Sequence, residues 1–150
     1  MVNMNDRMKL ILKDERGQGC YLEIDAIVTE ITNNTKIIRD CIIYDKDGVL
    51  EEEKINFERI LKMVGDWTGY EVSCNELRFN LEVISPRYFL KFADKLSSML
   101  IQKYTQKKVV VYITLYDDEI ELRFHTYRKD ERLWLDKDLN KYNVPILCLM

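Results

Sequence analysis

The stretch that decides the fold is Val109–Thr126, with the sequence VVVYITLYDDEIELRFHT. Side chains alternate in Val109–Tyr116 and again in Glu119–Thr126, and both runs are rich in β-branched and aromatic residues. A period of two in such residues predicts β-strands. The two residues between the runs, Asp117 and Asp118, form a loop short enough to join antiparallel strands. The stretch therefore predicts a β-hairpin.

A two-residue loop also sets the pairing within this hairpin. Tyr116 lies opposite Glu119, and the same register brings Val110 opposite His125. One face is then wholly apolar and is predicted to lie on the core, while the other face is polar and aromatic. The residues of this second face are Tyr112, Thr114, Tyr116, Glu121, Arg123, His125 and Tyr127.

Two amphipathic helices are predicted before the hairpin. Asn56 is suited to cap the first, apolar residues recur at helical spacing through Phe57–Trp67, and Gly69 is a plausible end. Ser85-Pro86 opens the second helix, because Ser caps a helix and Pro fits its first turn. The apolar stripe of the second helix consists of Phe89, Phe92, Ala93, Leu96, Met99 and Leu100.

Further strands are predicted on both sides of these elements. The predicted strands are Met8–Lys13, Cys20–Thr32, Lys36–Tyr44 and Leu77–Val83, and Pro145–Met150 is expected to form a last strand or an extended tail. Asn33-Asn34 is expected to join the second and third as a hairpin, and Lys137–Tyr142 is expected to form a short helical turn. The prediction is a single α+β domain over residues 1–150, with a largely antiparallel sheet of six or seven strands and two main helices packed against it.

Composition excludes several classes of protein. The chain has 150 residues, of which 47% are hydrophobic and 33% charged, so it is neither disordered nor of low complexity. A net charge of −3 argues against a general nucleic-acid binder. No apolar run approaches the roughly 20 residues of a membrane span. The opening MVNMNDRMKL lacks the pattern of a signal peptide. We therefore expect a cytoplasmic location and no membrane partner.

Metal and cofactor motifs are absent from the sequence. Cys20, Cys41, Cys74 and Cys148 form no C-x-x-C pair, so we expect four reduced thiols and no metal site. No phosphate-binding glycine loop or hydrolase motif occurs, and we expect no cofactor and no enzymatic activity.

An enzyme remains an alternative because His125 is the single histidine of the chain. Together with Glu121 and Arg123 it could supply an acid–base pair and an anion clamp for a phosphorylated or nucleotide substrate. Strand alternation alone also produces such a row of polar side chains. A solvated polar face is therefore the preferred interpretation.

Charge is distributed unevenly along the chain. Pro86–Lys108 holds six cations against Asp94, a net charge of +5, which could make an RNA-contacting helix through Lys91 and Lys95. A charged run is more often the solvated side of a helix, so nucleic acid is not the preferred partner. Asp45–Glu58 has a net charge of −4 and is better suited to a basic partner.

The last quarter of the chain carries a resemblance to a known group of proteins. Asp117–Met150 contains the run ELRFH, YR, LWL and Y-x-x-P. In these features it resembles small cytosolic immunity proteins of bacterial contact-dependent inhibition and other polymorphic toxin systems. The resemblance implies a non-enzymatic, usually acidic single domain. Such a domain binds a toxin domain, commonly a nuclease, and blocks its active site or its access to substrate.

The partner-binding surface is predicted on the hairpin and the segment after it. Tyr and Arg are common anchors of protein interfaces, and carboxylates supply charge complementarity. The predicted surface consists of Tyr112, Tyr116, Asp117, Asp118, Glu119, Glu121, Arg123, His125, Tyr127, Asp130 and Glu131. Trp134, flanked by two leucines, is expected to close the core instead.

Overall fold

The predicted hairpin lies at the centre of the fold. The computed structural model describes residues 1–13 and 21–150, and in it β5 (Val109–Tyr116) pairs with β6 (Glu119–Thr126). The predicted register is confirmed, with Tyr116 opposite Glu119 and Val110 opposite His125. Asp117 has a positive φ of 50°. Tight two-residue hairpin loops need this conformation, and Asp tolerates it better than most residues.

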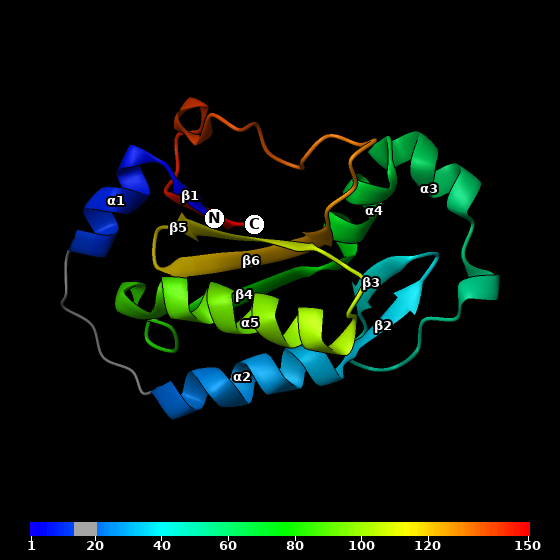
Figure 1. Ribbon diagram of the computed structural model, residues 1–150, viewed down its shortest axis with the longest axis horizontal. Coiled ribbons are helices and arrows are strands. Elements are labelled where there is room, and N and C mark those ends of the chain that lie inside the picture. The colour runs from blue at the N-terminus through cyan, green and yellow to red at the C-terminus, as the bar shows by residue number, and fades with distance from the viewer. Residues whose placement is uncertain (14–20) are drawn as a thin grey trace.

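Five strands form the main sheet, in the order β1-β7-β5-β6-β4. The added strands are β1 (Val2–Met4), β4 (Glu76–Asn80) and β7 (Ile146–Leu149), and every pairing is antiparallel. The predicted strands at 77–83 and 145–150 are therefore confirmed in slightly different bounds, whereas β1 was not predicted. Because β1 pairs with β7, the two ends of the chain lie side by side (Figure 1).

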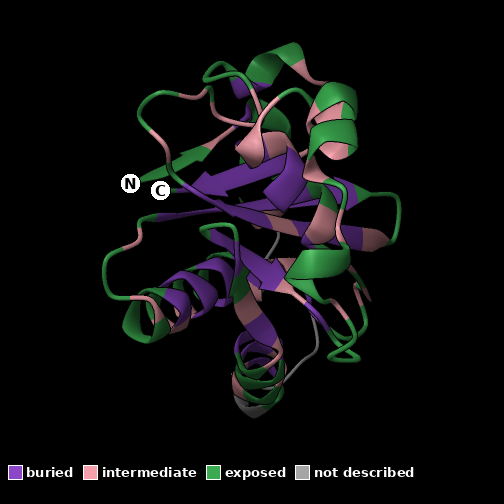
Figure 2. Ribbon diagram, turned by 90° about the vertical axis from the view of Figure 1, so that its right-hand side faces the viewer, coloured by how far each residue is buried: buried purple, intermediate pink, exposed green. Residues whose placement is uncertain are grey.

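Two helices cover one face of this sheet (Figure 1). A 3₁₀ turn, η2 (Pro86–Tyr88), leads into α5 (Phe89–Lys103), close to the predicted start. The predicted stripe of α5 is buried on the apolar face of the hairpin, apart from the half-buried Met99. Beside α5 lies α2 (Tyr21–Asn33), and Figure 2 shows buried residues on the sides of both helices that face the strands.

The strands predicted near the N-terminus are wrong. Met8–Lys13 belongs to α1 (Asp6–Lys13), and the described part of Cys20–Thr32 belongs to α2, while Cys20 itself lies outside the described residues. The buried side chains of α2 include Ile24, Val28 and Ile31. Their spacings of four and three residues match a helical face, and this face outweighs the β propensity of Ile and Val.

A separate two-stranded sheet replaces the single strand predicted at Lys36–Tyr44. It consists of β2 (Thr35–Ile38) and β3 (Cys41–Tyr44). Arg39 and Asp40, between the strands, have positive φ values of 48° and 64°, as a tight hairpin turn requires. The predicted hairpin around Asn33-Asn34 is therefore wrong, because the turn lies a few residues later.

Two short helices pack against this second sheet. In α3 (Phe57–Val64) the predicted cap is confirmed, because the Asn56 side chain accepts a hydrogen bond from the Arg59 N–H at 3.1 Å. The helix ends at Gly65 (φ 92°), and Gly69 lies inside the next helix, α4 (Trp67–Cys74). The α+β class is confirmed. The described residues form five α-helices and two sheets, not two main helices and one sheet.

The second face of the main sheet is covered by residues 127–145, which we call the covering segment. It crosses the sheet on the side away from α5 and contains the short turn η3 (Leu139–Lys141) (Figure 1). Trp134 packs edge-on against Tyr112, with 5.3 Å between ring centroids. Both the helical turn and the role of Trp134 in closing the core are confirmed.

One buried side chain fastens the covering segment to the N-terminal strand. Asn5 Nδ2 donates to the carbonyls of Leu139 (3.2 Å) and Val144 (2.7 Å). Its Oδ1 accepts from the N–H groups of Met8 and Ile146, each at 3.0 Å. Both polar ends of Asn5 are therefore satisfied without water.

Candidate functional site

The predicted polar face of the hairpin is not one open surface. Its centre is buried, with exposed fractions of 1% for Tyr112, 4% for Glu121 and 1% for His125. The covering segment packs on Tyr112 through Trp134. Arg123 is half-buried and lies against the Trp134 ring. The expectation of an exposed centre is therefore wrong, because the chain folds back over its own sheet.

The remaining predicted residues lie at the two ends of the hairpin. Tyr116, Asp117 and Asp118 are exposed and Glu119 is half-buried at the loop end. The opposite end holds Tyr127, Asp130 and Glu131, of which the first two are exposed. The two ends are roughly 25 Å apart, because a strand rises about 3.3 Å per residue. The eleven predicted residues therefore do not form one site.

His125 has only internal partners among the described residues. Its Nδ1 lies 2.8 Å from the Thr126 carbonyl, and its ring stacks on Tyr112 at 5.7 Å. Burial lowers the pKa of His125, which favours the neutral ring at pH 7. Its predicted partner Glu121 bonds to arginines instead. This geometry gives the enzyme alternative no accessible acid–base pair.

A buried carboxylate joins the two sheets, although it was not predicted as important. Glu71 of α4 is fully buried, and its Oε1 accepts from the Ile42 N–H and from the Thr126 hydroxyl, both at 2.8 Å. Its Oε2 pairs with the Arg128 guanidinium at 2.7 Å. Glu71 thus connects β3, α4, β6 and the start of the covering segment, and its role is structural.

The described cysteines are free thiols inside the protein. Cys41 and Cys148 are buried and Cys74 is half-buried, while Cys20 lies outside the described residues. Burial raises the pKa of Cys41 to about 12 and that of Cys148 to about 11. These thiols therefore stay protonated at neutral pH and are weak nucleophiles.

Glu131, one of the predicted binding residues, caps a helix. Its Oε2 accepts from the Thr68 N–H (2.8 Å) and hydroxyl (2.7 Å), and its Oε1 accepts from the Trp67 N–H (3.2 Å). These N–H groups belong to the first turn of α4, where no helical carbonyl is available to them. Glu131 therefore fastens the covering segment to α4.

This cap predicts a pH-dependent stability. Burial by itself raises the pKa of Glu131, but the hydrogen bonds from Thr68 and Trp67 and the nearby Arg128 charge hold it below its usual value of 4.5. A carboxyl whose pKa is lowered on folding stabilises the protein above its unfolded pKa, and this stabilisation is lost as the pH falls through the folded pKa. We expect Glu131→Gln to lower the free energy of unfolding by about 1 kcal/mol at neutral pH.

Urea denaturation across a pH series checks this expectation. The difference between wild type and Glu131→Gln should shrink below a pH of about 4.5. Glu53→Gln, at an exposed position, is the matched control and should show no such pH dependence. A constant difference down to the acid transition would contradict the cap.

At the loop end of the hairpin, Arg78 of β4 holds three carboxylates together. Its guanidinium lies 2.9 Å from Glu76, 3.0 Å from Glu119 and 2.9 Å from Glu121. It also lies over the Tyr116 ring, 5.9 Å from the centroid. Arg78 was not predicted as a site residue, since nothing in the sequence shows that β4 lies beside β6.

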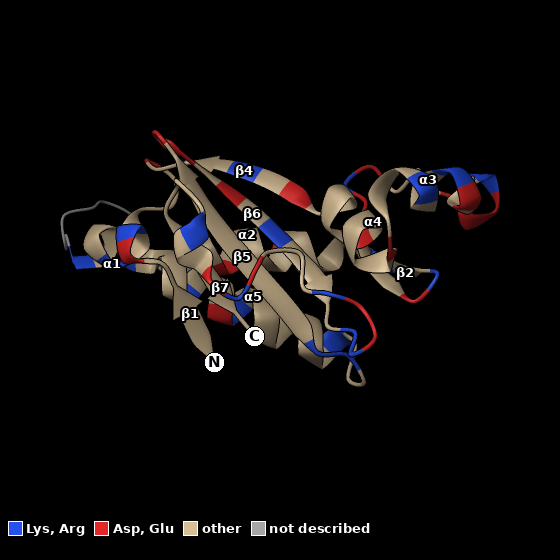
Figure 3. Ribbon diagram, turned by 90° about the horizontal axis from the view of Figure 1, so that it is seen from above, with Lys and Arg blue, Asp and Glu red and all other residues tan. Residues whose placement is uncertain are grey.

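The contacts of Arg78 order the surface at this end of the hairpin. We call this surface the acidic tip, and it consists of Tyr116, Asp117, Asp118, Glu119 and Glu82. The Asp118 carbonyl accepts from the Leu81 N–H at 2.9 Å, which ties the loop to the turn after β4. Tyr116 is 40% exposed. Figure 3 shows acidic residues gathered at this end of the hairpin.

Part of the positive charge of Pro86–Lys108 is used in contacts within the fold, whereas Lys91, one of the two cations predicted to contact RNA, is exposed. Lys103 Nζ donates to the carbonyls of Thr32 (2.8 Å) and Thr35 (2.9 Å). Lys95 pairs with Asp25 at 3.5 Å, and Lys107 pairs with Asp40. The contacts of Lys95 and Lys103 hold α5 against α2 and β2, and Lys107, after α5, contacts the turn between β2 and β3. The RNA-contacting alternative is left with less available charge.

Metal clusters and membrane-spanning helices are both absent from the part of the chain that the structure describes. Over residues 1–13 and 21–150, no group of three or more His, Cys, Asp or Glu side chains is arranged to hold a metal ion. None of the helices in these ranges is both long and apolar enough to cross a membrane.

Comparison with known proteins identifies the family of this chain. Neither the curated proteins nor the solved structures gave a match to this chain. The family comparison matched residues 3–149, which include every strand of the described residues except the first residue of β1. The chain belongs to the Uncharacterized protein PM0498 family.

Proposed function

We propose that this protein is an immunity-type inhibitor that binds a cognate bacterial toxin domain, a nuclease, in the cytoplasm. It acts by stoichiometric association and blocks the active site of the toxin or its access to substrate. The observation that carries the proposal is the acidic tip, a rigid and exposed surface that combines an aromatic side chain with carboxylates.

The chemistry of the acidic tip suits a nuclease as partner. Proteins that bind a phosphate backbone do so through Lys and Arg side chains. Asp117 and Asp118 are exposed and no described cation pairs with them. Their negative charge is therefore available to the Lys and Arg side chains with which a nuclease binds phosphate. Complementary charges of this kind accelerate encounter and reject wrong partners. Tyr116 adds a large contact surface of the kind that anchors protein interfaces.

The rigidity of the acidic tip supports the same proposal. Arg78 joins Glu76 of its own strand to Glu119 and Glu121 of β6, and the Leu81–Asp118 hydrogen bond ties down the loop itself. A surface that is already ordered before binding loses less conformational entropy when the partner arrives. Ordering of the interface then reduces the affinity less.

A growth-protection assay tests this function. The reading frame that precedes the gene is first examined for a toxin domain, the chain is co-expressed with that domain, and wild type is expected to restore growth. Reversing Asp117, Asp118 and Glu119 to Lys should abolish protection, because the partner then meets like charges.

The matched control reverses three acids on another surface. Glu51, Glu52 and Glu53, in and before η1 (Glu52–Lys54), are exposed and lie outside the acidic tip. Their reversal to Lys should leave protection intact, with folding of both variants checked by thermal melting. Full protection by the variant reversed at the acidic tip would remove this surface from the interface. Loss of protection only in the control would place the interface on the Asp45–Glu58 acids.

A further inference from the structure

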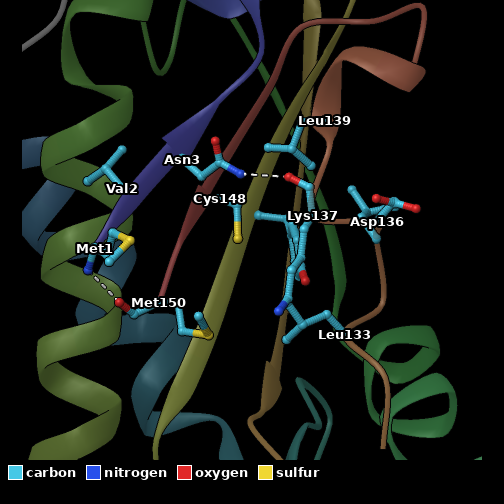
Figure 4. Close-up of a pocket in the computed structure, with 11 residues that line it drawn as sticks. Met1, Val2, Asn3, Leu133, Asp136, Lys137, Leu139, Cys148 and Met150 are labelled. Carbon is cyan, nitrogen blue, oxygen red and sulfur yellow. Dashed lines mark hydrogen bonds between the residues drawn. The ribbon is translucent and has the colours of Figure 1, made fainter.

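A cavity lies between the covering segment and the edge of the main sheet. It has a volume of about 340 Å³ and is walled by side chains of β1, β5, β7 and residues 133–139 (Figure 4). Most of its wall is apolar, from Leu133, Leu135, Leu139, Tyr112 and Cys148. The volume and the apolar lining are typical of sites for small organic molecules.

A groove of about 710 Å³ adjoins this cavity. The residues that line both are Leu133, Leu135, Asp136, Lys137 and Met150. Two more cations, Lys129 and Arg132, line the groove, and all three cations are exposed. No carboxylate of the described residues lies within ion-pair distance of them. The two acids of the groove have other partners.

Glu131 and Asp136, the two acids that line the groove, bind elsewhere in the protein. Glu131 caps α4, and Asp136 pairs with Lys141 at 2.7 Å. The groove therefore presents three cations that have no carboxylate partner among the described residues next to an apolar cavity, against the two acids Glu131 and Asp136. A ligand that matches both features has an apolar body and an anionic head.

We propose that the cavity binds the alkyl chain of a small free carboxylate, of the medium-chain fatty acid type, with its carboxylate group among Lys137, Arg132 and Lys129. The apolar wall excludes water from the chain, which favours binding in proportion to the area buried. The cations favour the acid over a neutral molecule of the same length. This site does not depend on the acidic tip, which lies on the loop end of the hairpin.

Trp134 reports on this site. Its ring contacts Tyr112, which lines the cavity, and Trp134 itself lines the groove. The chain contains two Trp residues, so a Trp67→Phe protein has Trp134 as its single reporter. Titration of this protein with hexanoate, octanoate and decanoate should give a saturable fluorescence change. Affinity should rise about fourfold for each added methylene until the cavity is full.

Matched ligands and variants test separately the recognition of the carboxylate by the cations and the binding of the alkyl chain in the cavity. Octanol should bind about tenfold more weakly than octanoate, and Lys137→Glu should remove this preference. Lys54→Glu, at an exposed and distant position, is the control and should keep the preference. Two variants that fill the cavity, Cys148→Leu and Leu133→Phe, should lose binding of octanoate and of octanol. One of these two variants is enough for the test, provided that its cooperative thermal transition shows that it is folded.

Three results would overturn the proposal. They are no saturable change with any of the acids, equal affinity for octanoate and octanol, and undiminished binding in a folded cavity-filling variant. Calorimetric titration repeats each comparison without the fluorescent reporter. A failure here leaves the growth-protection result of the acidic tip unaffected, so the two proposals are tested separately.

Discussion

Phe92→Ala is expected to lower the free energy of unfolding by roughly 3–5 kcal/mol. Phe92 lies in the middle of α5, is fully buried and packs edge-on against Phe79 of β4, with 5.8 Å between ring centroids. Its truncation removes apolar contacts on the sheet side of the helix and leaves a cavity that the rigid strands cannot fill. Urea denaturation followed by circular dichroism measures the change.

Ser98→Ala is the matched control for this substitution. Ser98 lies in the same helix but is exposed, so its replacement should change stability by no more than about 0.5 kcal/mol. Similar losses in the two variants would show that α5 does not present the described face to the sheet.

Glu71→Ala is expected to cost a similar amount, roughly 3–5 kcal/mol, for a different reason. The substitution leaves Arg128 without its ion pair, and it also leaves the Ile42 N–H and the Thr126 hydroxyl without their acceptor. Each of these groups is then buried or half-buried without a partner, which costs more than the lost bonds themselves contribute.

Two further variants distinguish the effect of losing the buried Glu71–Arg128 pair from the effect of losing an exposed ion pair. Glu71→Gln keeps the volume and one acceptor oxygen, so its loss should be smaller than that of Glu71→Ala. Glu58 pairs with Lys62 on the exposed side of α3, at 3.3 Å, and Glu58→Ala should cost at most about 1 kcal/mol. Equal losses in the free energy of unfolding for Glu71→Ala and Glu58→Ala would contradict the structural role of Glu71.

Local signals made some of these elements predictable. The hairpin of β5 and β6 follows from side-chain alternation and a two-residue loop, and α5 follows from its Ser-Pro start and apolar stripe. Each of these signals comes from residues that are close together in the sequence, so no knowledge of distant contacts is needed. By contrast, Ile24, Val28 and Ile31 suit a strand by residue type and a helix by spacing, and only packing against the sheet decides for the helix.

The candidate site was less predictable, since it depends on contacts between distant parts of the chain. Nothing local shows that the covering segment folds back over the hairpin and packs on Tyr112. The same applies to Arg78, which reaches Glu119 and Glu121 across a strand pairing, and to Glu131 as a cap of α4. The loop residues were predicted correctly as exposed because a tight turn projects into solvent.

The most direct test of the proposed inhibitor surface compares two tyrosines of equal exposure. Tyr116 at the acidic tip is 40% exposed, and Tyr127 at the far end of the hairpin is 39% exposed. Calorimetric titration of the toxin domain with each Ala variant gives the two dissociation constants. We expect Tyr116→Ala to weaken binding about thirtyfold, which corresponds to about 2 kcal/mol, and Tyr127→Ala to change it less than about threefold. A large loss for Tyr127→Ala with none for Tyr116→Ala would contradict binding through the acidic tip.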